Sequence, residues 1–287
     1  MKFSSGLLLK IPLNTYWQTL KARCRTAFMK AMLVLLLLMP VISSAVVGGK
    51  TLTDGSFRQT VALTYKALPN QSQGEVYCSG TLIGPRLVLT AAHCISLGAK
   101  AFKVTKEEFA QRTWIYIGDS PVEAKPMATP QFKVQRAVIY PPSDASHSDL
   151  AVLVLEQEVN LENYQIRPAP LMIAGKSLIG RELTHVGFGQ TESKGPKGEK
   201  AAFSLPIRGL NGYNGLEVGE MFKPSPGACH GDSGGSAYVT DVDGKMKFVG
   251  VENAISNHPC GEAATFFVPV SENMLRWIRA LNMPLFE

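Results

Sequence analysis

Cys229-His230-Gly231-Asp232-Ser233-Gly234-Gly235-Ser236 is the stretch from which the fold and the chemistry of this chain are best inferred. A serine among glycines can be a simple turn residue, because glycine adopts a positive φ at little cost. The same glycines also let backbone N–H groups approach a substrate oxygen without interference from side chains. Taken alone, the stretch therefore leaves a turn and a nucleophile as alternatives.

Two segments upstream carry the partners that a serine nucleophile requires. Leu89-Thr-Ala-Ala-His-Cys94 has a histidine at the end of an apolar run, and Ser148-Asp-Leu-Ala-Val-Leu-Val-Leu155 has an acid that leads into a buried strand. Either segment alone is more often structural than catalytic. Together, His93, Asp149 and Ser233 supply the base, the acid and the nucleophile of a catalytic triad.

The order of the three residues distinguishes among serine hydrolases. Residues 231–235 also satisfy the G-x-S-x-G pattern of α/β-hydrolases, in which the serine precedes the acid and the histidine. His258 is the only histidine after Ser233, and no βαβ pattern precedes the serine. The order His, Asp, Ser also differs from that of the subtilisins, so both of these families are excluded.

Short alternating stretches separated by turn residues dominate the chain after Val46. The clearest strand candidates are Leu82–Leu89, Phe132–Tyr140, Leu150–Leu155, Leu183–Phe188 and Lys247–Val251. Many short strands with almost no long helical period favour a β-barrel or a β-sandwich. The clearest helix is predicted near the end, where Ser271 can cap an apolar stripe made of Met274, Leu275, Ile278 and Leu281.

The net charge of +6 comes from the beginning of the chain. Residues 1–45 contain Lys2, Lys10, Lys21, Arg23, Arg25 and Lys30 and no acidic residue. The other 23 of the 29 basic residues balance the 23 acidic residues, so the chain after Ala45 is formally neutral. The charge therefore gives no indication of nucleic-acid binding.

The same segment has the pattern of a secretory signal. Residues 31–39 form an apolar core after the basic stretch, and Ser43 and Ala45 fit the small-x-small cleavage pattern. A membrane anchor is the alternative, but the apolar run is only about a dozen residues, against the roughly 20 that span a bilayer. We therefore predict a cleaved segment over residues 1–45, with Met1 or Met29 as the first residue, and a secreted or periplasmic protein.

Export would expose the cysteines to an oxidising compartment, which favours disulfides. Cys24 lies in the segment to be removed, and Cys78, Cys94, Cys229 and Cys260 follow it. Four cysteines allow three pairings. No CxxC pair with a metal-like partner occurs, so we expect no zinc site.

From Val46 to the final helix, the chain resembles the trypsin/chymotrypsin family of serine proteases. Besides the three segments above, Val46-Val-Gly-Gly49 resembles the mature N-terminus of that family. Cys78-Ser-Gly-Thr-Leu-Ile83 resembles the strand that faces the catalytic histidine, and Gly187-Phe-Gly189 the opening of the second barrel. The resemblance implies an all-β fold of two antiparallel six-stranded β-barrels with a C-terminal helix.

The resemblance also implies the domain organisation and the roles of the site residues. Residues 46–165 would form the N-terminal barrel with His93 and Asp149, and residues 166–287 the C-terminal barrel with Ser233 and the helix. Ser233 would attack the scissile carbonyl, His93 would transfer the proton, and Asp149 would orient the imidazole. The backbone N–H groups of Gly231 and Ser233 would form the oxyanion hole, and no metal or organic cofactor is expected.

The disulfides implied by the resemblance are Cys78–Cys94 and Cys229–Cys260. In this family a new N-terminal amine pairs with the acid before the serine and orders the oxyanion hole. Here these groups would be Val46 and Asp232. Because the predicted cleavage site directly precedes Val46, export itself would create the activating terminus, whereas a longer mature chain would be a zymogen.

The resemblance makes a specificity for Arg or Lys unexpected. Gly227, followed by Ala228, occupies the position at which trypsin-like enzymes have an Asp. Ile255 and Thr265 replace glycines of the pocket wall, which would narrow the pocket as in elastase-like members. We predict cleavage after small or medium apolar P1 residues such as Ala, Val or Thr.

The expected partners are protein or peptide substrates, and we allow for a protein inhibitor. We expect no nucleic acid, no stable membrane anchor and a monomer. The alternative function is that of a catalytically silent serine-protease-like binding protein. Such homologues usually lack a triad residue or the Gly231-Asp232-Ser233 geometry, whereas this chain retains both.

Overall fold

The computed structural model describes residues 47–68, 71, 74–120, 131–141, 149–190, 195–211, 215–219, 226–256, 259–262 and 264–286. All of them belong to Ser43–Glu287, one of the two units into which the chain divides. The signal segment predicted over residues 1–45 and the predicted new terminus at Val46 lie outside the described residues. No helix in the described part of the chain is long and apolar enough to cross a bilayer.

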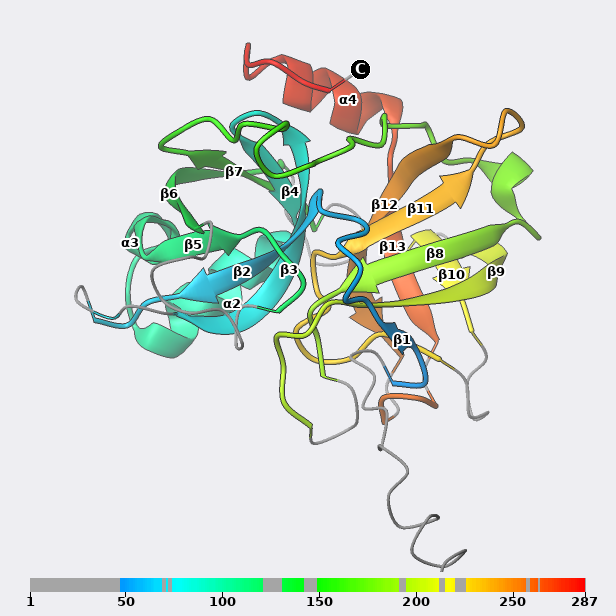
Figure 1. The fold of residues 1–287 in the computed structure, drawn as a ribbon, viewed down its shortest axis with the longest axis horizontal. Coiled ribbons are helices and arrows are strands. Elements are labelled where there is room, and N and C mark those ends of the chain that lie inside the picture. The colour runs from blue at the N-terminus through cyan, green and yellow to red at the C-terminus, as the bar shows by residue number, and fades with distance from the viewer. Residues whose placement is uncertain are drawn as a thin grey trace, which may run out of the picture. The chain divides into compact units, whose positions relative to one another are not determined.

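Six antiparallel strands close the first barrel in the order β2-β3-β4-β7-β6-β5 (Figure 1). They are β2 (Thr60–Tyr65), β3 (Glu75–Gly84), β4 (Leu87–Thr90), β5 (Thr113–Tyr116), β6 (Gln131–Ile139) and β7 (Ala151–Leu155). Val61, Leu63, Leu153 and Leu155 lie two residues apart on their strands and pack together in the interior, as strand alternation requires. The barrel interior is thus filled by side chains.

The chain between β4 and β5 forms two helices that the sequence analysis did not predict, α2 (Ala92–Phe102) and α3 (Lys106–Gln111). The prediction of one strand over Leu82–Leu89 was wrong as well. Pro85 and Arg86 form the turn of a hairpin there, and β3 pairs with β4 on either side of it. Proline favours such a turn because its ring fixes φ and it has no N–H to donate.

The second barrel is also antiparallel and six-stranded. Its strands follow the order β9-β10-β13-β12-β11-β8, and pairing of β8 with β9 closes it, while β1 (Lys50–Thr51) adds to the edge of β9. The strands are β8 (Glu182–Gly187), β9 (Ala201–Asn211), β10 (Gly215–Val218), β11 (Ser236–Thr240), β12 (Met246–Ile255) and β13 (Thr265–Pro269). The predicted fold class, two six-stranded barrels, is therefore confirmed.

The connection from β7 to β8 contains the short helix η1 (Lys176–Leu178). The boundary predicted between residues 165 and 166 falls in this connection, and the division into two separate domains stays a prediction. The C-terminal helix α4 (Glu272–Arg279) is present as predicted, and the Ser271 hydroxyl caps it by accepting a hydrogen bond from Met274 N at 3.3 Å.

Apolar side chains of both barrels and of α4 form one continuous cluster. Leu89 and Val152 from the first barrel pack in it with Phe248 and Val251 from the second, and Ile278 of α4 is fully buried in it. This shared core fixes the ends of β4 and β7 relative to β12. His93 and Asp149 directly flank the first two strands, so the core also fixes their position next to the second barrel.

Candidate active site

His93 and Asp149 lie in direct contact at the end of the first barrel. His93 is in the first turn of α2, whose N-cap residue Ala91 has no side chain able to cap the helix. Asp149, just before β7, accepts a hydrogen bond from the backbone N–H of His93 at 2.7 Å through Oδ1. Its Oδ2 lies 2.5 Å from His93 Nδ1. The carboxylate of Asp149, 56 positions away in the sequence, thus accepts from the N–H of His93, which has no partner within the first turn of the helix, and also orients the imidazole.

The two partners differ in their exposure to solvent. The Asp149 side chain is 4% exposed, whereas that of His93 is 25% exposed. A buried carboxylate that accepts two hydrogen bonds is held in one position. Because Asp149 binds Nδ1, the other ring nitrogen, Nε2, is the one that can act as a general base.

Ser233 lies in a tight turn that only glycines permit. Gly231 and Gly234 have φ of +105° and +83°, a region that L-residues rarely adopt. A Cβ on Gly234 would overlap Thr90 Oγ1 and the carbonyl oxygen of Ser79, both from the first barrel. The glycines of the starting motif are therefore needed for backbone conformation and for the close approach of the two barrels.

Ser79 of β3 joins the nucleophile turn to the first barrel, a role that the sequence analysis missed. Its backbone N–H donates to Ser233 O at 2.8 Å, and its hydroxyl donates to Gly231 O at 2.9 Å. The same hydroxyl accepts a hydrogen bond from Phe188 N at 2.9 Å. The two carbonyl oxygens bound by Ser79 belong to the residues on either side of Asp232, so Ser79 ties the whole nucleophile turn to β3.

The N–H groups expected to form the oxyanion hole belong to Gly231 and Ser233. Within the described part of the chain, neither N–H donates a backbone hydrogen bond. Asp232 between them is fully buried and accepts hydrogen bonds from Gly189 N at 2.9 Å and Cys229 N at 2.8 Å. The turn is thus fixed from both sides while two donors stay free, which is the requirement for binding an oxyanion.

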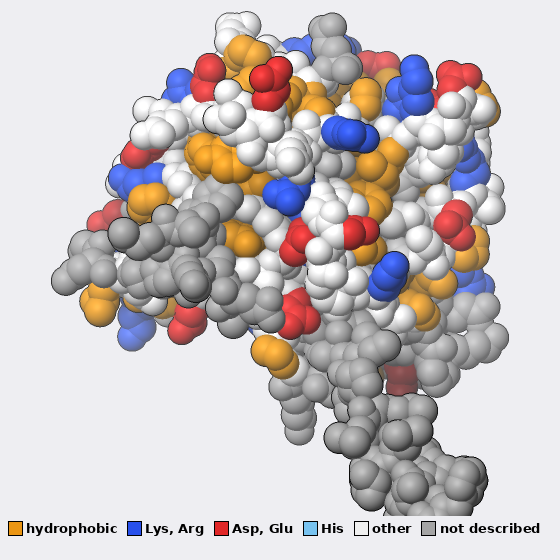
Figure 2. All heavy atoms as spheres, in the orientation of Figure 1, with side chains coloured by type: hydrophobic (Ala, Val, Ile, Leu, Met, Phe, Trp, Pro, Cys, Tyr) orange, Lys and Arg blue, Asp and Glu red, His pale blue; other side chains and the backbone are white. Residues whose placement is uncertain are grey.

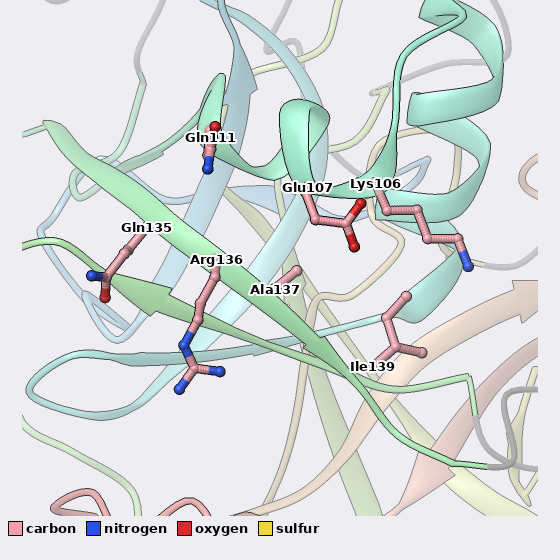
Figure 3. A pocket seen from close by; sticks show the side chains of 7 residues that line it. All are labelled: Lys106, Glu107, Gln111, Gln135, Arg136, Ala137 and Ile139. Atoms are coloured by element: carbon pink, nitrogen blue, oxygen red, sulfur yellow. The ribbon is translucent and has the colours of Figure 1, made fainter.

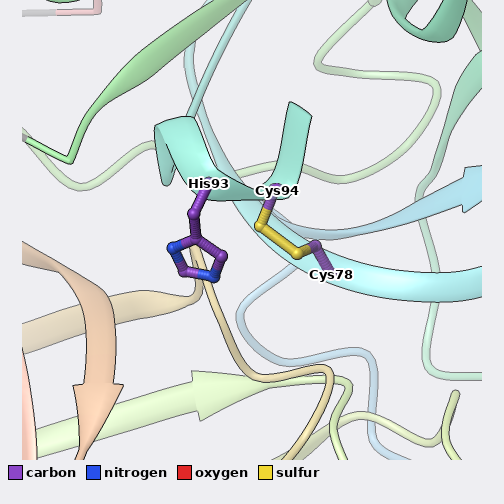
Figure 4. Close-up of side chains that lie close together, drawn as sticks. All are labelled: Cys78, His93 and Cys94. Atoms are coloured by element: carbon purple, nitrogen blue, oxygen red, sulfur yellow. A yellow bond between two sulfur atoms is a disulfide. The ribbon is translucent and has the colours of Figure 1, made fainter. Parts of the chain in front are cut away.

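Both disulfides of the structure brace this site. Cys78–Cys94 joins β3 to the first turn of α2 beside His93, and Cys229–Cys260 begins four residues before Ser233. The pairing is the one that the resemblance implies. Figure 4 shows His93 next to the first disulfide, where Cys78, His93 and Cys94 bring potential metal-ligand atoms within 4.8 Å of one another. Sulfur atoms in a disulfide are not thiolates, so this cluster does not form a zinc site.

The residues predicted to line the specificity pocket come together on neighbouring segments. Gly227 and Ala228 precede Cys229, and Ala228 N donates to Thr265 Oγ1 at 3.1 Å. Thr265 of β13 is buried and lies directly opposite Ile255 of β12 in the sheet. The two proposed wall residues are therefore cross-strand neighbours.

The chain just after the predicted new terminus also lies beside this pocket. Val47 forms an isolated antiparallel bridge with Gly227, with a hydrogen bond from Gly227 N to Val47 O at 3.1 Å. Gly48, with a φ of +70°, lies against Pro226. The described N-terminal residues thus reach the segment that contains Cys229 and Asp232.

Glu252 of β12 is a third acidic residue at the site, and the sequence analysis did not assign it a role. It is 2% exposed, and its Oε2 has no hydrogen-bond partner among the described residues. Burial raises the pKa of its carboxyl well above the usual value, and the nearby carboxylates of Asp232 and Asp149 add to this effect. A hydrogen-bonding interaction with the Ser233 side chain opposes the shift.

The raised pKa of Glu252 predicts a pH-dependent stability. The folded state retains a proton that the unfolded chain releases above about pH 4.3, so stability is fully present below that pH and decreases as pH rises through the raised pKa. We expect Ser233→Ala/Glu252→Gln to be more stable than Ser233→Ala at neutral pH, with the difference vanishing near pH 4. Urea unfolding of both proteins across this range measures it, and the Ser233→Ala background prevents self-digestion. If both proteins lost the same stability between pH 4 and neutral pH, the raised pKa of Glu252 would be contradicted.

Other surface features lie apart from these residues. Figure 3 shows a hollow between α3 and β6, lined by Lys106, Glu107, Gln111, Gln135, Arg136, Ala137 and Ile139. It contains none of the predicted site residues, and its charges are of both signs. Acidic and basic side chains are likewise interspersed on the face in Figure 2. This mixture agrees with the formally neutral composition of the chain after Ala45.

Comparison with known proteins shows a matching family model and several similar proteins. The family model described as Trypsin matches residues 46–278. Chymotrypsin-like elastase family member 1 of Homo sapiens is 28% identical over 260 residues, covering 84% of this chain and 93% of that protein. The protein of the same description from Rattus norvegicus is 27% identical over 253 residues, covering 81% and 88%. Serine protease SP24D of Anopheles gambiae is 28% identical over 241 residues, covering 82% and 80%.

Proposed function

This chain belongs to the trypsin family and is a serine-type endopeptidase, and we propose that it is a secreted protease that uses His93, Asp149 and Ser233 as its catalytic triad. The observation that carries this proposal is the contact of His93 Nδ1 with Asp149 Oδ2 at 2.5 Å, beside a glycine-supported turn that contains Ser233. The substrates of the family are proteins or peptides.

The proposed reaction follows from the roles of these groups. Ser233 Oγ attacks the scissile carbonyl carbon while His93 takes the hydroxyl proton, and the buried Asp149 carboxylate stabilises the resulting imidazolium. The carbonyl oxygen becomes an oxyanion that the N–H groups of Gly231 and Ser233 bind. His93 then gives its proton to the leaving amine, and water hydrolyses the acyl-enzyme by the same route.

Activation by export is the second part of the proposal. Removal of residues 1–45 would leave Val46 with a free amine one residue before Val47, which hydrogen-bonds with Gly227. Asp232 is fully buried, and two backbone N–H groups orient its carboxylate. A cation from the new terminus would neutralise this buried charge, which supports an ion pair between Val46 and Asp232.

Specificity for small or medium apolar P1 residues is the third part. Gly227 supplies no charge to the pocket, and Ala228 is small. Ile255 and Thr265 lie opposite each other in the sheet and would limit the depth of the pocket. The relatives described as chymotrypsin-like elastases favour the same assignment.

The experiment that tests the proposal is intact-mass analysis of the secreted protein before and after treatment with a fluorophosphonate probe. We expect one adduct on a chain that begins at Val46 and none on the Ser233→Ala variant. A Val46 chain without an adduct would instead support the catalytically silent binding protein. An unreactive chain that begins upstream of Val46 would indicate a zymogen and refute activation by export.

A further inference from the structure

Glu252 is fixed next to the nucleophile by the backbone of the second barrel. Gly234 N donates to Glu252 O at 2.8 Å, and Glu252 N donates to Gly235 O at 2.9 Å. The residue is therefore hydrogen-bonded on both backbone sides to the two residues that follow Ser233. The pKa of its carboxyl responds to Ser233, Asp149 and Asp232, in agreement with this backbone placement beside the nucleophile turn.

An unpartnered buried carboxyl oxygen is energetically costly. Glu252 Oε2 has no partner among the described residues although the residue is only 2% exposed. The charged groups that face it, Asp149 and Asp232, are both acidic, and His93 is already hydrogen-bonded to Asp149. A buried polar atom left without a partner costs about 1–3 kcal/mol, which a ligand with a matching group can recover. A polar group of a bound substrate could therefore form the hydrogen bond that Glu252 Oε2 lacks.

The position of Glu252 identifies which substrate atom can reach it. During catalysis Ser233 Oγ bonds to the P1 carbonyl carbon, and the P1 Cα is attached to that same carbon. The first side-chain atoms beyond the P1 Cβ thus lie near Oγ and near Glu252, whose backbone is hydrogen-bonded to the two residues that follow Ser233. Glu252 also shares β12 with Ile255, which belongs to the proposed pocket wall.

We propose that Glu252 is a specificity-determining residue that selects a hydroxyl-bearing P1 side chain, threonine or serine, over an apolar side chain of similar size. The inference rests on the proposed triad and narrows the proposed preference for small P1 residues. A hydroxyl both donates and accepts, so it pairs with the carboxyl whether Glu252 is protonated or ionised. A valine or alanine at P1 leaves Oε2 unpaired and enclosed.

A lysine or arginine at P1 is the competing choice for an acidic pocket. Their charged ends lie at the far end of a long side chain, away from the atoms that adjoin Oγ. Ile255 and Thr265 occupy the sheet positions that would limit a deep pocket. The geometry therefore favours the short hydroxyl over the long cation.

The test compares kcat/KM for peptides that differ only at P1, with Thr against Val and Ser against Ala, and with Lys as a third choice. For the natural chain we expect Thr over Val by about tenfold or more, the ratio that corresponds to one unpaired buried group. Glu252→Val should remove this preference, and Glu252→Gln, which still donates and accepts, should retain part of it. Glu182→Val, a change of an exposed glutamate at the start of β8, is the matched control and should leave the ratio unchanged.

Two further measurements separate this inference from the proposed triad. The rate of fluorophosphonate labelling reports on Ser233 without a P1 side chain and is measured on the natural chain and on Glu182→Val: a serine that is labelled but shows no Thr preference refutes only the role of Glu252, whereas a serine that is not labelled refutes the triad. Calorimetric binding of product peptides ending in Thr or Val to the Ser233→Ala protein tests the preference without catalysis. Equal rates and affinities for Thr and Val, an unchanged ratio in Glu252→Val, or a preference for Lys would each overturn the role of Glu252.

Discussion

Replacement of His93 by alanine should lower kcat by about 10⁶-fold, because removing the general base of a serine hydrolase has an effect of that order. In this structure His93 Nδ1 is bound to Asp149 Oδ2 at 2.5 Å, so Nε2 is the ring nitrogen that would take the proton from Ser233. The expected result is an unchanged fold with an almost inactive serine. Steady-state kinetics on a small-P1 peptide, with circular dichroism as the test of folding, measures this effect.

A control on the same helix separates loss of the base from damage to α2. Lys100 lies in the last turn of α2 and is exposed, so Lys100→Ala should leave kcat within about twofold of that of the natural chain. A comparable loss in both variants would mean that the helix, and not the imidazole, is responsible. A His93→Ala protein that keeps most of its activity would exclude His93 as the base.

Asp149→Asn should lower kcat by about 10⁴-fold while leaving the fold intact. The carboxylate accepts from both the Nδ1 edge of the imidazole and the backbone N–H of His93. An amide has only one oxygen, so its NH₂ group must face one of these two partners. If it faces the imidazole, the ring carries its proton on Nε2 and cannot take one from Ser233. If it faces the backbone N–H, two donors oppose each other at the start of α2.

The kinetics of a combined variant test whether the two residues act as a unit. His93→Ala/Asp149→Asn should be no slower than His93→Ala alone, because Asp149 acts through the imidazole. Asp243→Asn, in the exposed turn between β11 and β12, is the control for an acid-to-amide change and should have no effect. Additive losses in the double variant would show that Asp149 has a separate function.

Much of the fold could be predicted from the sequence because its signals are local. Alternation of apolar residues marked β6, β7, β8 and part of β12, and a serine before an apolar stripe marked α4. The glycines around Ser233 indicated a special backbone conformation, which the positive φ values of Gly231 and Gly234 bear out. The helices α2 and α3 were missed because their apolar residues, such as Phe109, face a barrel that the local pattern does not reveal.

Local sequence also determined which chemical groups the site contains. These are the imidazole of His93, the carboxylates of Asp149 and Asp232 and the hydroxyl of Ser233 in a glycine-rich stretch, with the triad in the order His, Asp, Ser. Only the tertiary structure decided which groups meet. Residues 56 positions apart, His93 and Asp149, are hydrogen-bonded because α2 begins where β7 begins. Ser79 reaches Gly231 across the barrels, 152 positions away. The role proposed for Glu252 arises in the same way, since its burial, its backbone hydrogen bonds to Gly234 and Gly235 and its unpaired oxygen among the described residues depend on distant segments and leave no mark in the sequence around it.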